Sequence, residues 1–262
     1  MVVRKSIEGF TLVELSLSIA FIAVLSIAVT LIINNAITTY ARGLTLNQIN
    51  TVGMDLVDDI RGEVQNSSIS SICEGNSDEC FLVKKTATLE KESTIMDDVP
   101  VFGAFCTGRY SYIWNSGYFY DGWNIAGDNN NNKITLRGYN NNIRLLKIKD
   151  KKGIACTSIS GENWPAEIDM GEEVNDDDIV ELLSNNDLAL YDFSAVRSVV
   201  NTGSSNSVSF YSMSFILGTI QGGINVMAGG DFCKAPESND AAENFDYCAI
   251  NKFNFAAQAI GG

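Results

Sequence analysis

The chain has 262 residues, enough for a sizeable core and an additional helix. Its 18 basic and 32 acidic side chains give a formal net charge of −14, which repels phosphate backbones and argues against nucleic-acid binding across the surface. The sequence contains no histidine, the commonest acid–base group and metal ligand, so we expect no enzyme activity and no cofactor.

An apolar segment lies near the N-terminus. Residues 10–33 contain a single charged side chain, Glu14. As a helix the segment would extend about 36 Å at 1.5 Å per residue, which is enough to span a hydrocarbon core of about 30 Å. Arg4 and Lys5 precede it, so we expect the short N-terminal tail in the cytoplasm and the rest of the chain on the outer side of the membrane.

The segment differs from a secretory signal peptide, in which a shorter apolar stretch is followed by a small-residue cleavage site. Here the small residue at the boundary is Gly9, before the apolar stretch, so a cut there leaves that stretch on the mature protein. A carboxylate such as Glu14 costs about 2.5–3.5 kcal/mol on membrane-insertion scales and normally finds a partner. The simplest alternative is a lone glutamate that reaches the headgroups from a plain signal anchor.

The stretch GFTLVEL at Gly9–Leu15, with basic residues just upstream, resembles the signature of bacterial type IV prepilins. This family includes type IV pilins and the pseudopilins of type II secretion and competence systems. The resemblance covers roughly residues 1–25. It implies that a prepilin peptidase cuts between Gly9 and Phe10 and N-methylates Phe10. It also implies that Glu14 meets the Phe10 amine of a neighbouring subunit, an ion pair that gains strength in a dry helix bundle.

The same resemblance implies the partners and the location. We expect other pilin subunits, the prepilin peptidase, an inner-membrane assembly platform and the membrane as partners, and no nucleic acid. The chain would cross the inner (cytoplasmic) membrane once and then enter an extracellular filament. The large, cysteine-containing domain favours a minor pilin or pseudopilin. A major pilin and a filament-borne adhesin or DNA-uptake pilin are the alternatives.

The helical pattern continues beyond the apolar segment, where apolar residues recur every three or four positions. These residues are Ile49, Val52, Leu56, Ile60 and Val64. We predict one helix from about Phe10 to Val64, with Gly43 and Gly53 as weak points, and two separate helices as the alternative. The chain then divides into a leader (1–9), a helix (10–66, of which 10–33 is the membrane and assembly part) and a globular outer domain (67–262).

The outer domain has the texture of short strands and turns. We predict strands at 99–106, 110–114, 117–120, 143–149 and 208–220, with a hairpin turn at Asn115-Ser116-Gly117. In the last strand the side chains alternate, with one face formed by Tyr211, Met213, Phe215 and Leu217. The predicted fold is therefore α+β and pilin-like, a long N-terminal helix whose amphipathic half packs on an antiparallel sheet stabilised by disulfides.

An aromatic stretch, YSYIWNSGYFYDGW, begins at Tyr110. The simpler interpretation is sheet core and cross-strand pairs. The alternative is a platform for stacking sugars or bases, carried by Tyr112, Trp114 and Trp123.

Six widely spaced cysteines behind an apolar segment indicate disulfides in an oxidising compartment, because no CxxC pair or histidine is present to build a zinc site. Six cysteines allow 15 pairings. Local pairing is the simplest and predicts Cys73–Cys80, Cys106–Cys156 and Cys233–Cys248. The alternative is that one or more are reduced core residues.

An acidic stretch occupies residues 167–187 and contains no basic side chain. A solvated loop is the ordinary interpretation of such a run. Some pseudopilins bind calcium in a C-terminal loop, so the resemblance makes Asp176, Asp177 and Asp178 calcium candidates, although we expect no metal.

Overall fold

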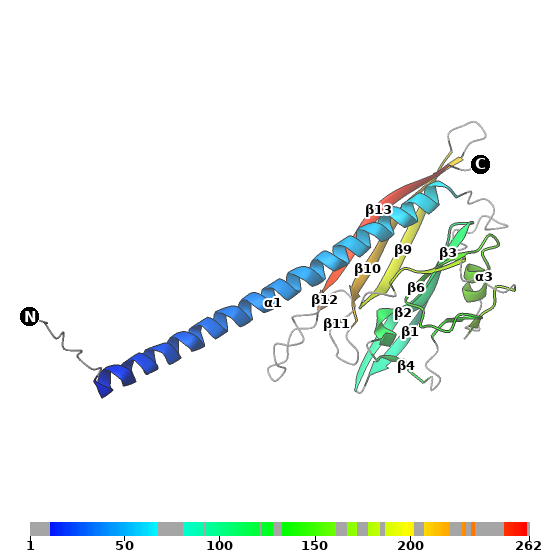
Figure 1. Cartoon of the computed structure of the whole chain (residues 1–262). Coiled ribbons are helices and arrows are strands. Elements are labelled where there is room, and N and C mark those ends of the chain that lie inside the picture. Colours follow the sequence, from blue (N-terminus) through cyan, green and yellow to red (C-terminus); the bar gives the residue numbers. More distant parts are fainter. Residues whose placement is uncertain are drawn as a thin grey trace, which may run out of the picture.

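The computed structural model describes residues 11–67, 81–91, 93–120, 122–127, 133–160, 167–171, 178–183, 187–201, 207–220, 227–228, 232–233 and 249–260. One long helix, α1 (Leu12–Gln65), extends from a β-rich domain (Figure 1). Its 54 residues correspond to about 81 Å. The first half stands away from the domain and the second half lies along it.

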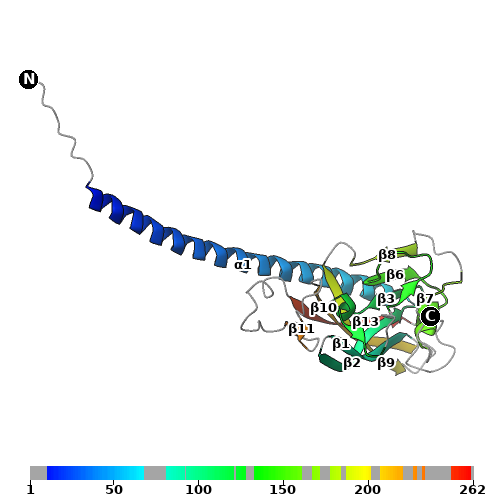
Figure 2. The same cartoon turned by 90° about the horizontal axis from the view of Figure 1, so that it is seen from below.

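The helix begins and ends at recognisable caps. Thr11 has extended backbone angles, and its side chain accepts a hydrogen bond from the Glu14 N–H. At the other end the Asn66 N–H donates to the Gly62 carbonyl. The prediction of one helix is confirmed, because α1 runs without a break through Gly43 and Gly53 and shows only a gentle curve (Figure 2).

A three-stranded antiparallel sheet lies next to the docked half of α1, in the order β13-β10-β9. Its strands are β9 (Leu188–Asn201), β10 (Ser207–Thr219) and β13 (Ile250–Ile260). The predicted alternation in β10 is confirmed, because Tyr211, Met213, Phe215 and Leu217 are all buried.

A six-stranded antiparallel sheet forms the rest of the domain, in the order β4-β1-β2-β3-β6-β8. Its strands are β1 (Leu82–Lys91), β2 (Thr94–Cys106), β3 (Tyr110–Asn115), β4 (Asn124–Ile125), β6 (Leu145–Lys149) and β8 (Ile179–Glu181). Two short strand pairs complete the described strands: β5 (Thr135–Leu136) with β7 (Glu167–Ile168), and β11 (Met227–Ala228) with β12 (Phe232–Cys233).

The helix and both sheets share one core. The buried stripe of α1 contacts aromatic side chains from both sheets in a single cluster. The main members are Ile49, Leu56, Ile60 and Val64 of α1, Phe105, Tyr112 and Trp114 of the six-stranded sheet, and Phe193, Tyr211, Phe215 and Phe253 of the three-stranded sheet. The predicted packing of the amphipathic half on the domain is therefore confirmed, with two sheets where one was expected.

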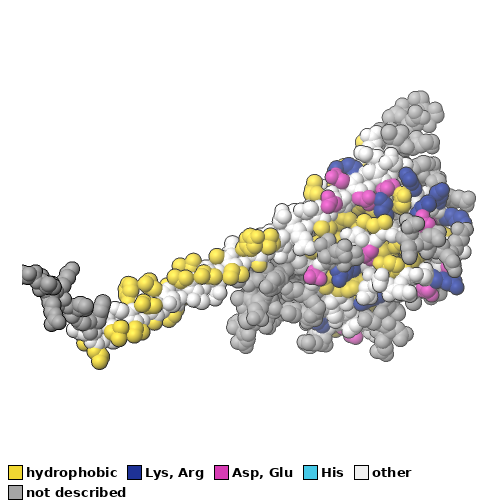
Figure 3. Space-filling view, in the orientation of Figure 1, with side chains coloured by type: hydrophobic (Ala, Val, Ile, Leu, Met, Phe, Trp, Pro, Cys, Tyr) yellow, Lys and Arg dark blue, Asp and Glu magenta, His cyan; other side chains and the backbone are white. Residues whose placement is uncertain are grey.

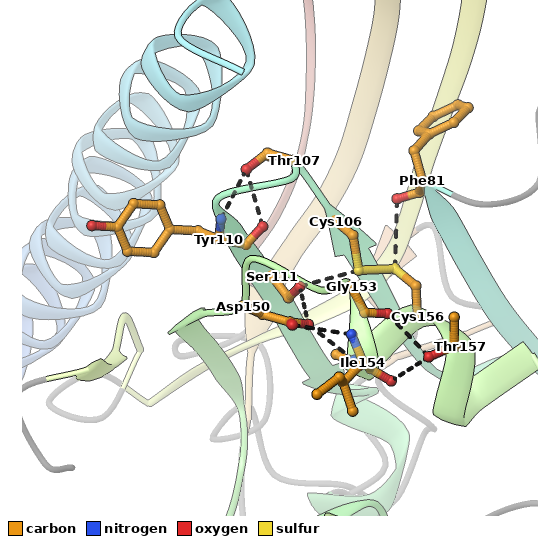
Figure 4. The surroundings of a disulfide bond; sticks show 11 residues. Phe81, Cys106, Thr107, Tyr110, Ser111, Asp150, Gly153, Ile154, Cys156 and Thr157 are labelled. Carbon is orange, nitrogen blue, oxygen red and sulfur yellow. Dashed lines mark hydrogen bonds between the residues drawn. A yellow bond between two sulfur atoms is a disulfide. The ribbon is translucent and has the colours of Figure 1, made fainter. Parts of the chain in front are cut away.

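A second cluster fills the opposite face of the six-stranded sheet. Two short helices cover it: α2 (Gly117–Tyr120) and α3 (Ile154–Ser160). A disulfide between Cys106 of β2 and Cys156 of α3 attaches α3 to the sheet (Figure 4).

The predicted strand at 117–120 and the hairpin before it are wrong, because these residues form α2. The chain leaves β3 with the Ser116 N–H bonded to the Val101 carbonyl, and the Phe119 N–H then bonds to the Ser116 carbonyl. Gly117 faces the Tyr191 ring so closely that an added Cβ would lie 2.4 Å from it. Long-range packing of this kind overrides the local strand preference of aromatic residues.

Candidate functional site

The free half of α1 is apolar on all sides and exposed. Every described side chain from residue 11 to residue 37 is exposed, including Leu12 at 84% and Phe21 at 66%. Figure 3 shows apolar side chains along this half and few charges. A helix that is apolar all round is normally buried in a membrane or among other chains, and α1 is long and apolar enough to cross a membrane.

Glu14 caps this helix through Thr11. The Thr11 N–H and hydroxyl both donate to Glu14 Oε2, each at 2.9 Å, and the Glu14 N–H donates back to Thr11 Oγ1 at 3.3 Å. This reciprocal arrangement is a capping box, and it places the carboxylate at the positive end of the helix dipole. Sequence reasoning favoured a neighbour's amine, with a lone glutamate at the headgroups as the alternative, and did not consider Thr11, although the Thr-x-x-Glu spacing indicates this local partner. Gly9 and Phe10 lie outside the described residues.

The docked half of α1 approaches β13 closely at Gly53. A Cβ on Gly53 would lie 2.0 Å from the tip of the Phe253 ring, so glycine is what allows this contact. Further along, the Arg61 guanidinium lies 5.9 Å from the centroid of the Phe255 ring, and its Nε donates to the Ala256 carbonyl. These contacts fix the second half of α1 on the three-stranded sheet.

A polar cluster joins α1 to the six-stranded sheet. Lys147 of β6 lies 2.6 Å from Asp59 Oδ1 and 2.9 Å from Glu63 Oε1, and Tyr112 donates to Asp59 Oδ2 at 2.6 Å. The Lys147 ammonium also lies 4.8 Å from the centroid of the Tyr110 ring. We call these five residues the Lys147 cluster.

Burial and hydrogen bonds shift the pKa of two members of the Lys147 cluster. Burial lowers the pKa of Lys147, but its hydrogen bonds to Asp59 and Glu63 outweigh burial, so the pKa is raised above its ordinary value. Burial, followed by the hydrogen bond to Asp59, raises the pKa of Tyr112 well beyond the usual range of a phenol. Sequence reasoning missed the cluster, because its contacts join three segments of the chain that are far apart, around residues 59–63, 110–112 and 147.

The structure contains the predicted disulfide between Cys106 and Cys156. It is buried beside Ser111, whose hydroxyl lies 3.1 Å from Cys106 Sγ and 2.8 Å from Asp150 Oδ2 (Figure 4). Asp150 also accepts the Ile154 N–H at the start of α3. The other two predicted pairs, Cys73–Cys80 and Cys233–Cys248, involve residues outside the described part of the chain.

The calcium candidates are only partly described. Asp178 forms an ion pair with Lys149 at 3.0 Å, and Asp176 and Asp177 lie outside the described residues. Within the described ranges, no group of three or more acidic or cysteine side chains is arranged to hold a metal ion.

Most described aromatic side chains of the stretch that begins at Tyr110 belong to the core. Tyr112 and Trp114 are each 1% exposed and Trp123 is 2% exposed. The alternative of a stacking platform on these three residues is therefore wrong, and the interpretation as sheet core is confirmed.

Comparisons of the chain with protein-family models, curated proteins and solved structures found no match. The fold and the exposed helix define an α+β domain that carries one helix suited to crossing a membrane.

Proposed function

We propose that this chain is a structural subunit, a minor pilin or pseudopilin, of a type IV pilus or related filament. It is assembled through the N-terminal half of α1 after a prepilin peptidase has cut between Gly9 and Phe10 and methylated Phe10. The observation that supports this proposal most is the division of α1. One half is exposed and apolar on every side, and the other half is docked on the domain through a buried stripe.

The free half needs apolar surroundings both before and after assembly. The inner membrane provides them first, and a bundle of equivalent helices provides them in the filament. The domain stays on the outer side throughout and does not have to unfold, because its core is built on the other half of α1.

Glu14 supports the same proposal. Both hydrogen bonds from Thr11 end on Oε2, so with respect to the described residues Oε1 remains available for the amine of a neighbouring Phe10. In an apolar bundle, removal of one partner from such an ion pair is heavily penalised. Glu14 would therefore fix the register at which each subunit joins the filament.

The expected partners are other pilin subunits, the prepilin peptidase and the inner-membrane assembly platform. The size of the domain favours a minor subunit, and the copy number in sheared filaments tests this. A dominant band of this chain would make it the major pilin. Within the described residues no feature favours the adhesin or DNA-uptake alternative, since Tyr112, Trp114 and Trp123 are buried.

Substitutions at Glu14 and Gly9 test the proposal in cells that assemble the filament. We expect Glu14→Ala to be cleaved and folded but depleted from sheared filaments. The matched control is Ser16→Ala, which changes another exposed polar side chain of the same helix. This variant should assemble normally. Gly9→Leu should leave an uncut, longer chain in the inner membrane. Normal assembly of both the Glu14 and the Gly9 variant would overturn the proposal.

A further inference from the structure

The Lys147 cluster brings an amine and two carboxyl groups into direct contact at the junction of α1 and β6. Lys147 Nζ lies 2.6 Å from Asp59 Oδ1 and 2.9 Å from Glu63 Oε1. The carboxyl carbon of Asp59, which is bonded to Oδ1, is therefore close to the Lys147 nitrogen. The Lys147 side chain is only 12% exposed and that of Glu63 17%, whereas that of Asp59 is 33% exposed. Asp59 and Glu63 are four residues apart on α1, one turn of the helix.

We propose that Lys147 and Asp59 form an intramolecular isopeptide bond, with Glu63 as the residue that carries the proton. The bond would cross-link α1 to β6. It requires no oxidant, metal or second protein, and it does not depend on the filament proposed above.

The reaction balances as a condensation with loss of one water. In the starting ion pair the hydrogen bonds to Asp59 and Glu63 favour the ammonium form of Lys147. The reactive form is the minor one, in which this proton has passed to Asp59 and a neutral amine lies beside a neutral carboxylic acid. The amine lone pair attacks the Asp59 carboxyl carbon, and the new C–N bond gives a tetrahedral intermediate. Glu63 takes a proton from the nitrogen and returns it to the departing hydroxyl group, which leaves as water.

The surroundings of the pair suit this reaction. The Tyr112 hydroxyl donates to Asp59 Oδ2 at 2.6 Å and would stabilise the negative charge that develops on that oxygen. The centroids of the Tyr110 and Tyr112 rings lie 4.8 Å and 5.7 Å from the nitrogen of Lys147, whose side chain is 12% exposed, and these rings limit access of water to that nitrogen. Figure 4 shows Tyr110 projecting from the sheet towards α1. Groups held in this way gain a large effective concentration, which speeds their reaction. Because the bond forms only once per molecule, the reaction does not have to be fast.

Glu63 has an oxygen that ion pairing leaves unused. Its Oε2 is buried and has no hydrogen-bond partner among the described residues, while Oε1 already contacts the reacting nitrogen. A buried carboxylate oxygen without a partner is unfavourable in a purely structural ion pair. It is what a proton carrier needs, because the oxygen is free to accept a proton from the intermediate.

Intact-mass measurement of the purified full chain, denatured and reduced, tests the bond directly. We expect a mass lower by about 18 Da, one water, than its residues and processing require. Trypsin should release a branched peptide in which Gly43–Arg61 is joined to Leu145–Lys149, because a bonded Lys147 is not cleaved. The full mass, together with cleavage after Lys147, would overturn the proposal. A branch between Leu145–Lys149 and Gly62–Lys84 would assign the bond to Glu63 and would also overturn it.

Two pairs of variants separate the roles. Lys147→Arg should abolish the mass loss, whereas Lys149→Arg, on the same strand, should retain it. Glu63→Gln should leave most molecules unbonded, whereas Asp58→Asn, which removes an exposed carboxylate next to Asp59, should leave them bonded. Full bond formation in the Glu63 variant would contradict its role as proton carrier. Circular dichroism of each variant checks that the fold is kept. If a variant does not fold, the intact mass of the wild-type chain still decides whether the isopeptide bond forms.

Discussion

At the scale of single residues, Gly53 determines how closely α1 approaches β13. An added methyl group would lie 2.0 Å from the Phe253 ring, so the ring or the helix must move. Gly53→Ala should therefore destabilise the domain by about 1–3 kcal/mol, although alanine favours helix by up to about 1 kcal/mol. Gly43 has nothing within 4 Å, so Gly43→Ala should be neutral or stabilising. Denaturant unfolding of both variants in detergent measures the difference, and equal stability would contradict the close contact.

Tyr112 makes the folded state sensitive to alkaline pH. Burial and the hydrogen bond to Asp59 raise its pKa above the value near 10 that it has in the unfolded chain. Above pH 10 the unfolded chain therefore loses a proton that the folded chain keeps. The stability contributed by Tyr112 is full below pH 10 and falls by about 1.4 kcal/mol per pH unit above it.

Tyr112→Phe should accordingly make the loss of stability between pH 10 and 12 shallower. It should also cost about 0.5–1.5 kcal/mol at neutral pH, because the hydrogen bond to Asp59 is lost. Tyr40→Phe is the control, since Tyr40 is 69% exposed on the free part of α1. Unfolding free energies at several pH values distinguish the two variants, and identical pH slopes would contradict the role given to Tyr112.

At the scale of elements, the two halves of α1 carry similar apolar residues but differ in what those residues contact. Leu56 is 3% exposed in the shared core, whereas Leu25 is 49% exposed on the free half. Leu56→Ala should cost about 2–5 kcal/mol of domain stability through the lost burial and the cavity. Leu25→Ala should leave domain stability unchanged. Thermal unfolding of the two variants checks this, and a large loss from the Leu25 change would mean that the free half also stabilises the domain.

The sequence was sufficient to predict elements whose period is regular. The spacing of Ile49, Leu56 and Val64 predicts the docked face of α1, and alternation along 208–220 predicts β10 and its buried face. The sequence was insufficient at 117–120, where the chain forms the short helix α2 with Gly117 packed closely against the Tyr191 ring. Such contacts depend on residues far away in the chain, which local patterns do not report.

At the scale of the whole molecule, the same distinction applies to the candidate sites. Local pairing predicts Cys106–Cys156, which the structure contains. The capping of Glu14 by Thr11 is also local and could have been predicted from its spacing. The Lys147 cluster could not, because Asp59 and Lys147 are 88 residues apart and meet only when α1 docks on the six-stranded sheet.

Under the proposed function, the overall arrangement would let one chain meet two environments. The domain carries its own core against residues 49–64 of α1, and the free half adds a rod that is apolar on all sides. The central claim is that this rod is kept in the mature protein and holds the subunit in a filament.

Mass spectrometry of the N-terminal peptide of this chain, taken from sheared filaments of the native cell, tests that claim most directly. We predict a peptide that begins at an N-methylated Phe10 and continues without a break through Glu14 into the apolar segment. A chain that retains the residues before Phe10, a chain cut after Ile33, or its absence from the filament fraction would contradict the claim.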